Sequence, residues 1–416
     1  MNKRVALFLS LLSVLIVSSQ ENPGFSGDPL NAKFITADVD RFYAALDRLE
    51  SGGNPFKTYI AEGSKGLQGF LAYRIYNADS LLKTVRERKQ EYINGRDNLR
   101  GLDSKKKRIR ASYAAMKYWY PDAVFPPIYF VVGRFNSGGT VSEDGLILGH
   151  EMQHDLEGLP GLVAHELIHF QQEFQIDENH WNLLASSLNE GGADFIGELI
   201  SGQNINALNY RFGERHLEKL ALEFVVSMEK DDNTDWLYGT SGKDHRPNDL
   251  GYWMGYKITK AYFDQATDKK QAIYDILHIA DAKAFLEKSG FLKPYLEQVG
   301  KMDETERKAL LVPFPSKKVT ATFTVTVPNA DDVVYITGNH ENLGNWNPSA
   351  VKMTRVSDYK RQVTLEINSP ATFKFTRGSW GSQALVKGVD GIPNLTFVEG
   401  GDEPNFSIEK WSDENN

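Results

Sequence analysis

The spacing of apolar residues divides the chain into a helical part and a β-rich part. Between residues 32 and 120, apolar positions recur at intervals of three and four with charged residues between them, most clearly over residues 37–49 and 79–99. This spacing is typical of amphipathic helices. Residues 126–135 and 144–152, on either side of the turn-forming NSGG, predict two short strands. Further helices are expected over residues 161–175, 184–201, 249–263 and 268–290.

The pattern changes after Leu311, where Pro313 and Pro315 interrupt the helical spacing and an alternation of apolar and polar residues begins. Strand-like runs separated by turn residues follow at 322–328, 332–338, 361–367 and 372–378. The chain is therefore expected to be an α+β multidomain protein. A mainly α-helical domain with a small β-sheet is expected over residues 24–312, followed by an antiparallel β-sandwich over 317–412, with the boundary between Leu311 and Lys317.

Length and charge narrow the class of protein. A chain of 416 residues is longer than one hydrophobic core usually serves, which agrees with several domains. Its 47 Lys and Arg residues against 55 Asp and Glu residues give a mildly acidic balance with no basic stripe. A nucleic-acid partner is therefore not expected.

The first residues have the pattern of a secretory signal peptide. Lys3 and Arg4 precede an apolar run from Val5 to Val17, and the small residues Ser18 and Ser19 close it, so residues 1–20 are expected to be removed. The alternative, a membrane anchor, needs about 20 apolar residues, and no later segment is apolar enough to span a bilayer. With no cysteine in the chain, we expect a bacterial protein that is secreted or periplasmic.

The segment His165-Glu166-Leu167-Ile168-His169 is the first candidate site. On a helix, residues four apart differ by about 40° in direction, so the two histidines project from one face and can bind one Zn²⁺ ion. Glu166 can then act as a general base on water at an open coordination position. The alternative is that two histidines fall four apart by coincidence.

A third ligand would make this segment a metal site. Glu190 follows His169 by 21 residues on the next predicted helix, and it can complete a His, His, Glu set. Asp194, one turn later, is placed to accept a hydrogen bond from a ligand histidine. Gly191 and Gly192 have no side chains, which would allow this helix to approach the metal closely.

These motifs resemble a known group of enzymes. HELIH followed by EGGAD looks like the gluzincin branch of zinc metallopeptidases, and residues 32–311 resemble a bacterial family of zinc-dependent proteases known from sequence. The resemblance implies a zincin-like fold, Zn²⁺ as cofactor and a peptide or protein as substrate. It implies His165, His169 and Glu190 as metal ligands, Glu166 as the catalytic base and Asp194 as support.

Such a reaction also needs a donor for the oxyanion that develops on the substrate. Residues 243–257 offer Tyr252 and Arg246 as the favoured catalytic candidates, with His245 and Tyr256 beside them. Two tyrosines four apart are more often core residues. The other histidines, among them His150, His154, His180 and His216, are expected to be structural or exposed. The strand before the metal helix, residues 144–152, is where related enzymes hold an extended substrate at a sheet edge.

The β-rich tail carries a second candidate site. The segments GNHENLGNW and FKF resemble family 20 carbohydrate-binding modules, which are starch-binding sandwiches. The resemblance implies Trp346 and Trp380 as residues that stack on sugar rings and Lys374 as a polar contact. The segment after Lys374 is shorter than the family usually shows. One alternative is that Trp346 is a core aromatic residue of a generic sandwich used for interdomain packing. Another is that the tail binds protein.

The sequence thus predicts an exported zinc metallopeptidase that hydrolyses peptide bonds through zinc-activated water and carries a module for starch-like polysaccharide. The alternative from another class is a non-catalytic glycan-binding protein with a structural zinc site.

Overall fold

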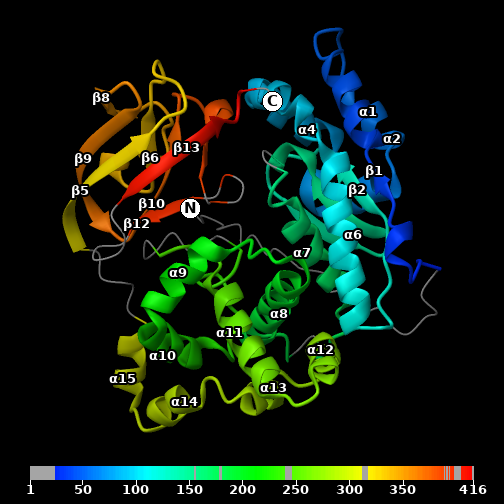
Figure 1. Cartoon of the computed structure of the whole chain (residues 1–416), viewed down its shortest axis with the longest axis vertical. Coiled ribbons are helices and arrows are strands. Elements are labelled where there is room, and N and C mark those ends of the chain that lie inside the picture. The colour runs from blue at the N-terminus through cyan, green and yellow to red at the C-terminus, as the bar shows by residue number, and fades with distance from the viewer. Residues whose placement is uncertain are drawn as a thin grey trace, which may run out of the picture.

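The computed structural model describes residues 24–153, 156–177, 180–238, 246–311, 317–387, 389, 392, 394–397 and 404–414. It forms a helical part with a small sheet, followed by a β-sandwich, as the sequence predicts (Figure 1). The expected signal peptide, residues 1–20, lies outside the described residues. None of the described helices combines the length and apolar composition that crossing a bilayer requires.

The small sheet has four strands: β1 (Phe34–Ile35), β2 (Ile128–Val131), β3 (Gly139–Ser142) and β4 (Gly145–Gly149). Their order is β1-β2-β4-β3, and β4 pairs in parallel with β2 and antiparallel with β3. The two strands predicted from the sequence are β2 and β4. The expectation that the strand at 144–152 forms the edge is wrong, because β4 lies inside the sheet and β3 forms the edge.

The helices before the metal-ligand segment surround this sheet. They are α1 (Ala37–Leu46), α2 (Phe56–Ala61), α3 (Lys65–Phe70), the π-helical turn η2 (Leu71–Ile75), α4 (Ala78–Glu87), α5 (Lys89–Asn94) and α6 (Leu102–Trp119). Among their side chains, Phe42, Tyr92 and Tyr113 are fully buried. The amphipathic spacing of residues 32–120 therefore builds a core, as expected.

The two helices with the candidate ligands are α7 (Leu159–Gln171) and α8 (Leu183–Ser201). The helix expected at 161–175 ends at Gln171 because the chain then turns to pair with another segment: the amides of Glu173 and Gln175 donate to the carbonyls of Leu277 and Ile279. Asn182 begins α8 by accepting a hydrogen bond from the Ala185 amide at 3.0 Å. Both helices have defined ends, which fixes the positions of the side chains between them.

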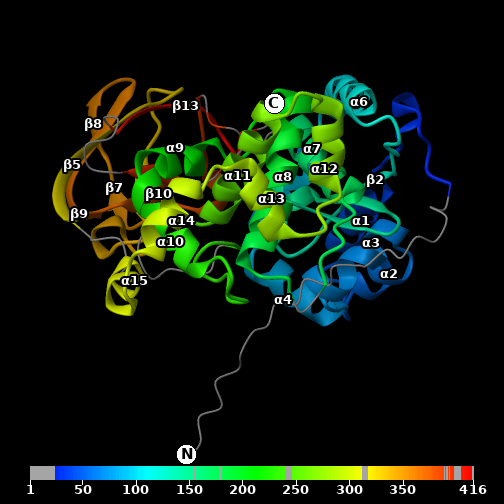
Figure 2. The ribbon, with the colours of Figure 1, turned by 90° about the horizontal axis from the view of Figure 1, so that it is seen from below.

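The later helices complete the helical part. They are α9 (Ala207–Arg215), α10 (Leu217–Ser227), α11 (Leu250–Gln265), α12 (Lys269–Leu277), α13 (Ala282–Ser289), α14 (Lys293–Gly300) and α15 (Glu304–Leu310). The helices predicted at 249–263 and 268–290 correspond to α11 and to α12 with α13. Figure 2 shows α7, α8 and α11 in the middle of the molecule, between the sandwich at one end and α1 to α3 at the other.

The sandwich consists of two sheets. One has the order β12-β10-β6-β7 and the other β11-β13-β5-β9-β8. Neighbouring strands are antiparallel except β13 and β5, which are parallel. Phe323, Ile336, Phe373 and Trp411 from both sheets pack in the core between them. The strands are β5 (Lys317–Thr326), β6 (Tyr335–Gly338), β7 (Val351–Lys352), β8 (Thr354–Ser357), β9 (Lys360–Ser369), β10 (Ala371–Thr376), β11 (Ala384–Val386), β12 (Leu395–Phe397) and β13 (Asn405–Trp411).

The two parts meet at a turn of the sandwich. The short helix η7 (Trp380–Ser382) lies against α5, where the Asn94 side-chain amide donates to the Gly381 carbonyl at 3.2 Å. Helix α15 ends at Leu310 and β5 begins at Lys317, while residues 312–316, where the domain boundary is predicted, lie outside the described residues.

Candidate metal centre

Helices α7 and α8 bring three ligand atoms together in the middle of the helical part. The Nε2 atoms of His165 and His169 are 3.0 Å apart. The Oε2 atom of Glu190 lies 3.6 Å from the first and 3.1 Å from the second. Within the described residues, these are the three side chains that could hold a metal ion together. The structure therefore unites the three ligands that the sequence predicts.

The separations of these atoms fit zinc. Tetrahedral coordination with bonds of roughly 2.0–2.1 Å places neighbouring ligand atoms about 3.3 Å apart. The separations of 3.0, 3.1 and 3.6 Å lie around this value. Two nitrogens and one oxygen are also the donor set of zinc sites that keep a fourth position open.

A hydrogen bond at Nδ1 holds the orientation of each histidine ring. Nδ1 of His165 lies 2.8 Å from Oδ1 of Asp194, and Nδ1 of His169 lies 2.8 Å from Oε1 of Gln172. The Gln172 amide group donates to the Asn189 carbonyl at 2.7 Å, which turns its oxygen toward His169. Both Nδ1 atoms can therefore donate to these acceptors, which leaves the two Nε2 atoms on the side of Glu190, where a cation can bind.

Asp194 has further partners that hold it in place. Its Oδ2 atom accepts hydrogen bonds from Tyr210 Oη at 2.6 Å and Asn206 Nδ2 at 2.7 Å. Its other oxygen is left for His165. The predicted supporting role of Asp194 is thus what its contacts allow. Gln172, which does the same for His169, was not predicted, because a glutamine at a helix end carries no sequence signal for metal binding.

Glycines allow α8 to pack closely against α7 and α11, although Gly191 does not face the metal site as the sequence suggested. A side chain on Gly197 would lie 3.2 Å from the His165 amide nitrogen, so this glycine allows α8 to approach α7. A Cβ atom on Gly191 would lie 2.1 Å from the Tyr256 nitrogen, and one on Gly255 would lie 1.7 Å from the Ser187 carbonyl oxygen. Gly191 therefore allows α11, rather than the metal, to approach α8.

The side chain of Glu166, a residue of α7, packs against the edge strand β3. A Cβ atom on Gly139 would lie 2.4 Å from Glu166 Oε1, so this carboxylate sits directly against the backbone of β3. Glu166 is buried, and this burial raises the pKa of its carboxyl group, while the histidines beside it lower it. The geometry thus places the Glu166 carboxylate between the three proposed ligands and the edge strand β3.

The charges of the ligands are coupled. Burial raises the pKa of Glu190, but the neighbouring His169 and His165 rings outweigh this effect and hold the pKa below its ordinary value. Burial lowers the pKa of His165, and the Asp194 and Glu190 carboxylates outweigh it in the opposite direction. Glu190 is thus held as an anion, the form that binds a metal.

Two tyrosines, rather than the predicted Arg246, contact the proposed ligands. The Tyr252 ring stacks on His165 with 6.0 Å between ring centres. The Tyr238 hydroxyl group donates to Glu190 Oε1 at 3.2 Å. Tyr238 was not considered from the sequence, since it belongs to no helix and the fold alone brings it to Glu190.

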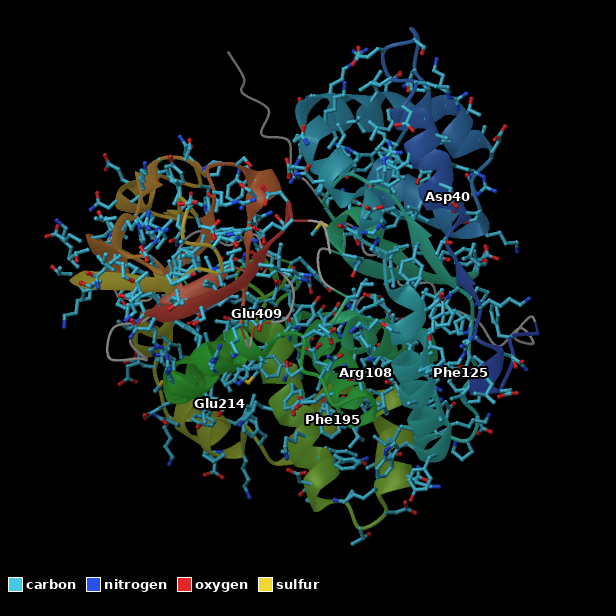
Figure 3. The ribbon with its side chains drawn as sticks, turned by 45° about the horizontal axis from the view of Figure 1, so that its top comes forward. Asp40, Arg108, Phe125, Phe195, Glu214 and Glu409 are labelled. Carbon is cyan, nitrogen blue, oxygen red and sulfur yellow. The ribbon has the colours of Figure 1, made fainter. Side chains whose placement is uncertain are left out.

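The other candidates for an oxyanion donor have different surroundings. Arg246 forms a buried ion pair with Glu223 at 2.7 Å and donates to the Asp235 carbonyl at 2.6 Å. Tyr256 packs edge-on against Phe195, which Figure 3 labels on α8, with 5.6 Å between ring centres. His245 and His154 lie outside the described residues.

The remaining histidines differ in burial. His150 is fully buried, with its Nε2 atom 3.2 Å from the Tyr43 hydroxyl oxygen. The side chain of His180 is 80% exposed. His216 is half-buried beside the Phe212 ring. All three histidines are therefore in structural or exposed positions, as expected from the sequence.

In the sandwich, Trp346 and Trp380 come together. Their ring centres are 6.4 Å apart and both side chains are partly exposed. Three successive residues, Gly344, Asn345 and Trp346, have φ values of 76°, 47° and 62°, a left-handed run that is strained for a tryptophan. The amide of Trp346 donates to the Gly338 carbonyl at 2.8 Å, which holds this turn.

The Lys374 amine is bound by groups of the sandwich itself. Its Nζ atom donates to Gln383 Oε1 at 3.0 Å and to the Ile392 carbonyl, and burial lowers the pKa of the amine to about 8. The Gln383 amide group donates in turn to the Trp380 carbonyl at 2.9 Å. In this arrangement Lys374 supports the turn that carries Trp380, and its contact with a sugar stays a prediction.

Two family models match the chain. Residues 132–287 match the family described as "Predicted Zn-dependent protease", and residues 318–385 match the "Starch binding domain". An α-amylase from Niallia circulans is 33% identical over 102 residues, which cover 22% of this chain and 8% of the amylase. The chain thus spans a small fraction of that relative. No solved structure matches.

These matches confirm both resemblances and their order along the chain. The region that matches the predicted zinc-dependent protease family contains His165, His169 and Glu190. The region that matches the starch-binding domain contains Trp346, Lys374 and Trp380.

Proposed function

We propose that this protein is an exported zinc-dependent metallopeptidase that hydrolyses peptide bonds. The observation that carries the proposal is the convergence of His165, His169 and Glu190 with Glu166 beside them. The match to a family of predicted zinc-dependent proteases supports it.

The chain's own residues supply most of the reaction. When bound, zinc provides a Lewis acid and lowers the pKa of water in its open position. Glu166 would accept a proton from the attacking water and pass it to the leaving amine. Tyr252, which stacks on His165, and Tyr238, which contacts Glu190, are the nearest candidates to donate a hydrogen bond to the oxyanion. The free edge of β3, beside Glu166, would pair with the main chain of an extended peptide.

The sandwich gives the proposal a second part. The paired, partly exposed rings of Trp346 and Trp380 offer two apolar faces on which sugar rings can stack. With the match to the starch-binding domain, they support binding of an α-glucan. The apolar run at residues 5–17 supports export to the periplasm or the medium.

A structural zinc site in a glycan-binding protein is the second candidate. It is favoured by the small exposure of the ligands, since the side chains of His165 and Glu190 are each 7% exposed and that of His169 is 14% exposed. A structural site usually has four protein ligands, however, and the described residues supply three. This difference favours the catalytic candidate.

Glu166→Gln separates the two candidates, because it removes the base and leaves the three ligands. We expect zinc content to stay as in the wild type and peptide hydrolysis to fall by about 100-fold or more. Glu62→Gln, at an exposed position, is the matched control and should keep full activity. Zinc-loaded wild-type protein that cleaves no peptide in a mixed-sequence library would instead support the structural site.

A further inference from the structure

The segment after β4 carries a buried carboxylate that the proposed reaction does not use. Glu151, in the short helix η4 (His150–Met152), is only 2% exposed. Burial raises the pKa of its carboxyl group to about 7, and hydrogen bonds from backbone amides oppose this effect. A buried carboxylate costs free energy unless hydrogen bonds compensate for it, so its contacts show what it is for.

Glu151 binds the loop that joins β2 to β3. Its Oε2 atom accepts a hydrogen bond from the Gly133 amide at 2.9 Å, and its Oε1 atom accepts one from the Phe135 amide at 3.1 Å. A carboxylate suits this pair of donors, because both of its oxygens accept hydrogen bonds. A glutamine side chain would instead turn an N–H group toward one of the two amides.

The loop has a strained conformation that its contacts impose. Phe135 has a φ of 57°, a left-handed value that is unfavourable for a bulky residue. The guanidinium group of Arg88 lies 3.6 Å from the centre of the Phe135 ring, and the Tyr92 hydroxyl group donates to the Gly133 carbonyl at 2.7 Å. Such strain persists only where the surroundings enforce it, and Glu151 binds the backbone of the strained residue itself.

Gln153 holds the other end of the loop. It is 5% exposed, and its side-chain amide donates to the Gly138 carbonyl at 3.1 Å and to the Gly149 carbonyl at 3.2 Å. Gly138 directly precedes Gly139, the first residue of β3, where a Cβ atom would lie 2.4 Å from Glu166 Oε1. Both ends of the loop are therefore tied to the segment after β4, and the loop leads to the backbone that contacts the proposed base.

We propose that Glu151 and Gln153 are positioning residues that hold the edge of β3 against Glu166, so that a peptide paired with β3 meets the base in one register. Both act through the backbone of residues 133–139. A displacement of about 1 Å at a reacting group can lower a rate by about 100-fold, so this support matters for the reaction. The inference rests on the proposed function, since it assumes that peptides pair with β3 and that Glu166 is the base.

Glu151→Gln and Gln153→Leu test the proposal in the zinc-loaded mature protein. Each variant removes hydrogen bonds at one end of the loop and leaves Glu166 and the three ligands in place. Hydrogen exchange, measured by mass spectrometry, should be about tenfold faster over residues 133–142 than in the wild type, while α6 keeps its wild-type rate. Glu87→Gln, at an exposed position on α4, is the matched control and should exchange as the wild type does.

Peptide binding and cleavage show whether the loop serves the site. In the Glu166→Gln background, each variant should bind fluorescein-labelled casein about tenfold more weakly than Glu166→Gln alone. With Glu166 intact, each should lower kcat/KM for casein by at least the same factor. If Glu151→Gln does not fold, Gln153→Leu alone decides the question.

Folded variants that exchange or bind casein as the parent protein does would overturn the proposal. A lower melting temperature with unchanged casein binding would also overturn it, because that result indicates a role in stability only. Wild-type protein that binds casein without cleaving it would count against the proposed hydrolysis, and the exchange and binding results would still decide whether Glu151 and Gln153 position β3.

Discussion

The side chains behind the ligands decide which nitrogen faces the metal. Gln172 holds His169 through its Oε1 atom, and Asp194 holds His165. Without these acceptors, each ring could turn or protonate at the wrong nitrogen. In the proposed zinc site, affinity would therefore depend on residues that do not touch the metal.

Gln172→Leu should lower zinc affinity by roughly 10- to 100-fold while the three ligands remain. The leucine cannot accept the Nδ1 proton of His169, so the ring loses its fixed orientation. Competition with a fluorescent chelator measures the change. Gln175→Leu, at an exposed position three residues later, is the control and should bind zinc as the wild type does. Equal affinities in the two variants would show that the His169 ring needs no such support.

At this scale the sequence predicts that His165, His169 and Glu190 meet, because their spacing along two helices is enough to bring them together. Asp194 follows for the same reason, being one turn from Glu190. Tyr238 and Gln172 could not be predicted, because one lies outside any helix and the other at a helix end. Arg246 shows the opposite case: its chemistry suits an oxyanion donor, but its ion pair with Glu223 depends on the packing of α10.

Helix packing determines how close the tyrosines come to the site. Helix α11 approaches α8 where Gly255 meets the Ser187 carbonyl and Gly191 meets the backbone of α11. One turn before Gly255, Tyr252 stacks on His165. A change in this crossing would therefore move Tyr252 relative to the ligands.

Gly255→Ala should destabilise the protein by about 1–3 kcal/mol, since a backbone atom blocks the new methyl group and α11 must shift. We expect zinc content to be retained and peptide hydrolysis to fall as Tyr252 moves. Chemical denaturation measures the first effect. Gly300→Ala, whose methyl group would meet nothing within 4 Å, is the control and should be neutral or slightly stabilising. A fully stable Gly255→Ala protein would contradict the proposed close crossing.

The elements themselves follow largely from hydrophobic spacing, with instructive exceptions. Helix α7 ends early because the residues after Gln171 pair with the segment after α12, a contact that no local pattern reveals. Strand β3 was missed because Gly138 and Gly139 suggest a turn. Gly139 is needed for another reason, since any side chain there would collide with Glu166.

At the scale of the whole molecule, the candidate sugar-binding site of Trp346 and Trp380 lies next to the contact between the helical part and the sandwich. Residues Asn94 and Gly381, nearly three hundred positions apart, are joined by a hydrogen bond next to Trp380. The order of the two regions could be predicted from their motifs, but this contact could not, because it depends on how two finished surfaces meet. A glycan held at Trp346 and Trp380 would lie beside α5.

Trp346→Ala should abolish most retention on insoluble starch, because it removes one of two stacking surfaces, each contributing on the order of 1 kcal/mol or more. Sedimentation with granular starch measures the bound fraction. Tyr359→Ala removes an exposed aromatic residue between β8 and β9, on the other sheet, and should bind as the wild type does. If the wild-type protein is not retained, the sandwich binds another partner.

The most direct test of the metal centre is the zinc content per chain of the purified mature protein, measured side by side for the wild type and Glu190→Ala. We predict about one zinc ion per wild-type chain, and clearly weaker retention in the variant after dialysis against a mild chelator. A wild-type protein that binds no zinc after reconstitution, or a variant that retains it equally well, would contradict the three-ligand site and the hydrolytic function proposed from it.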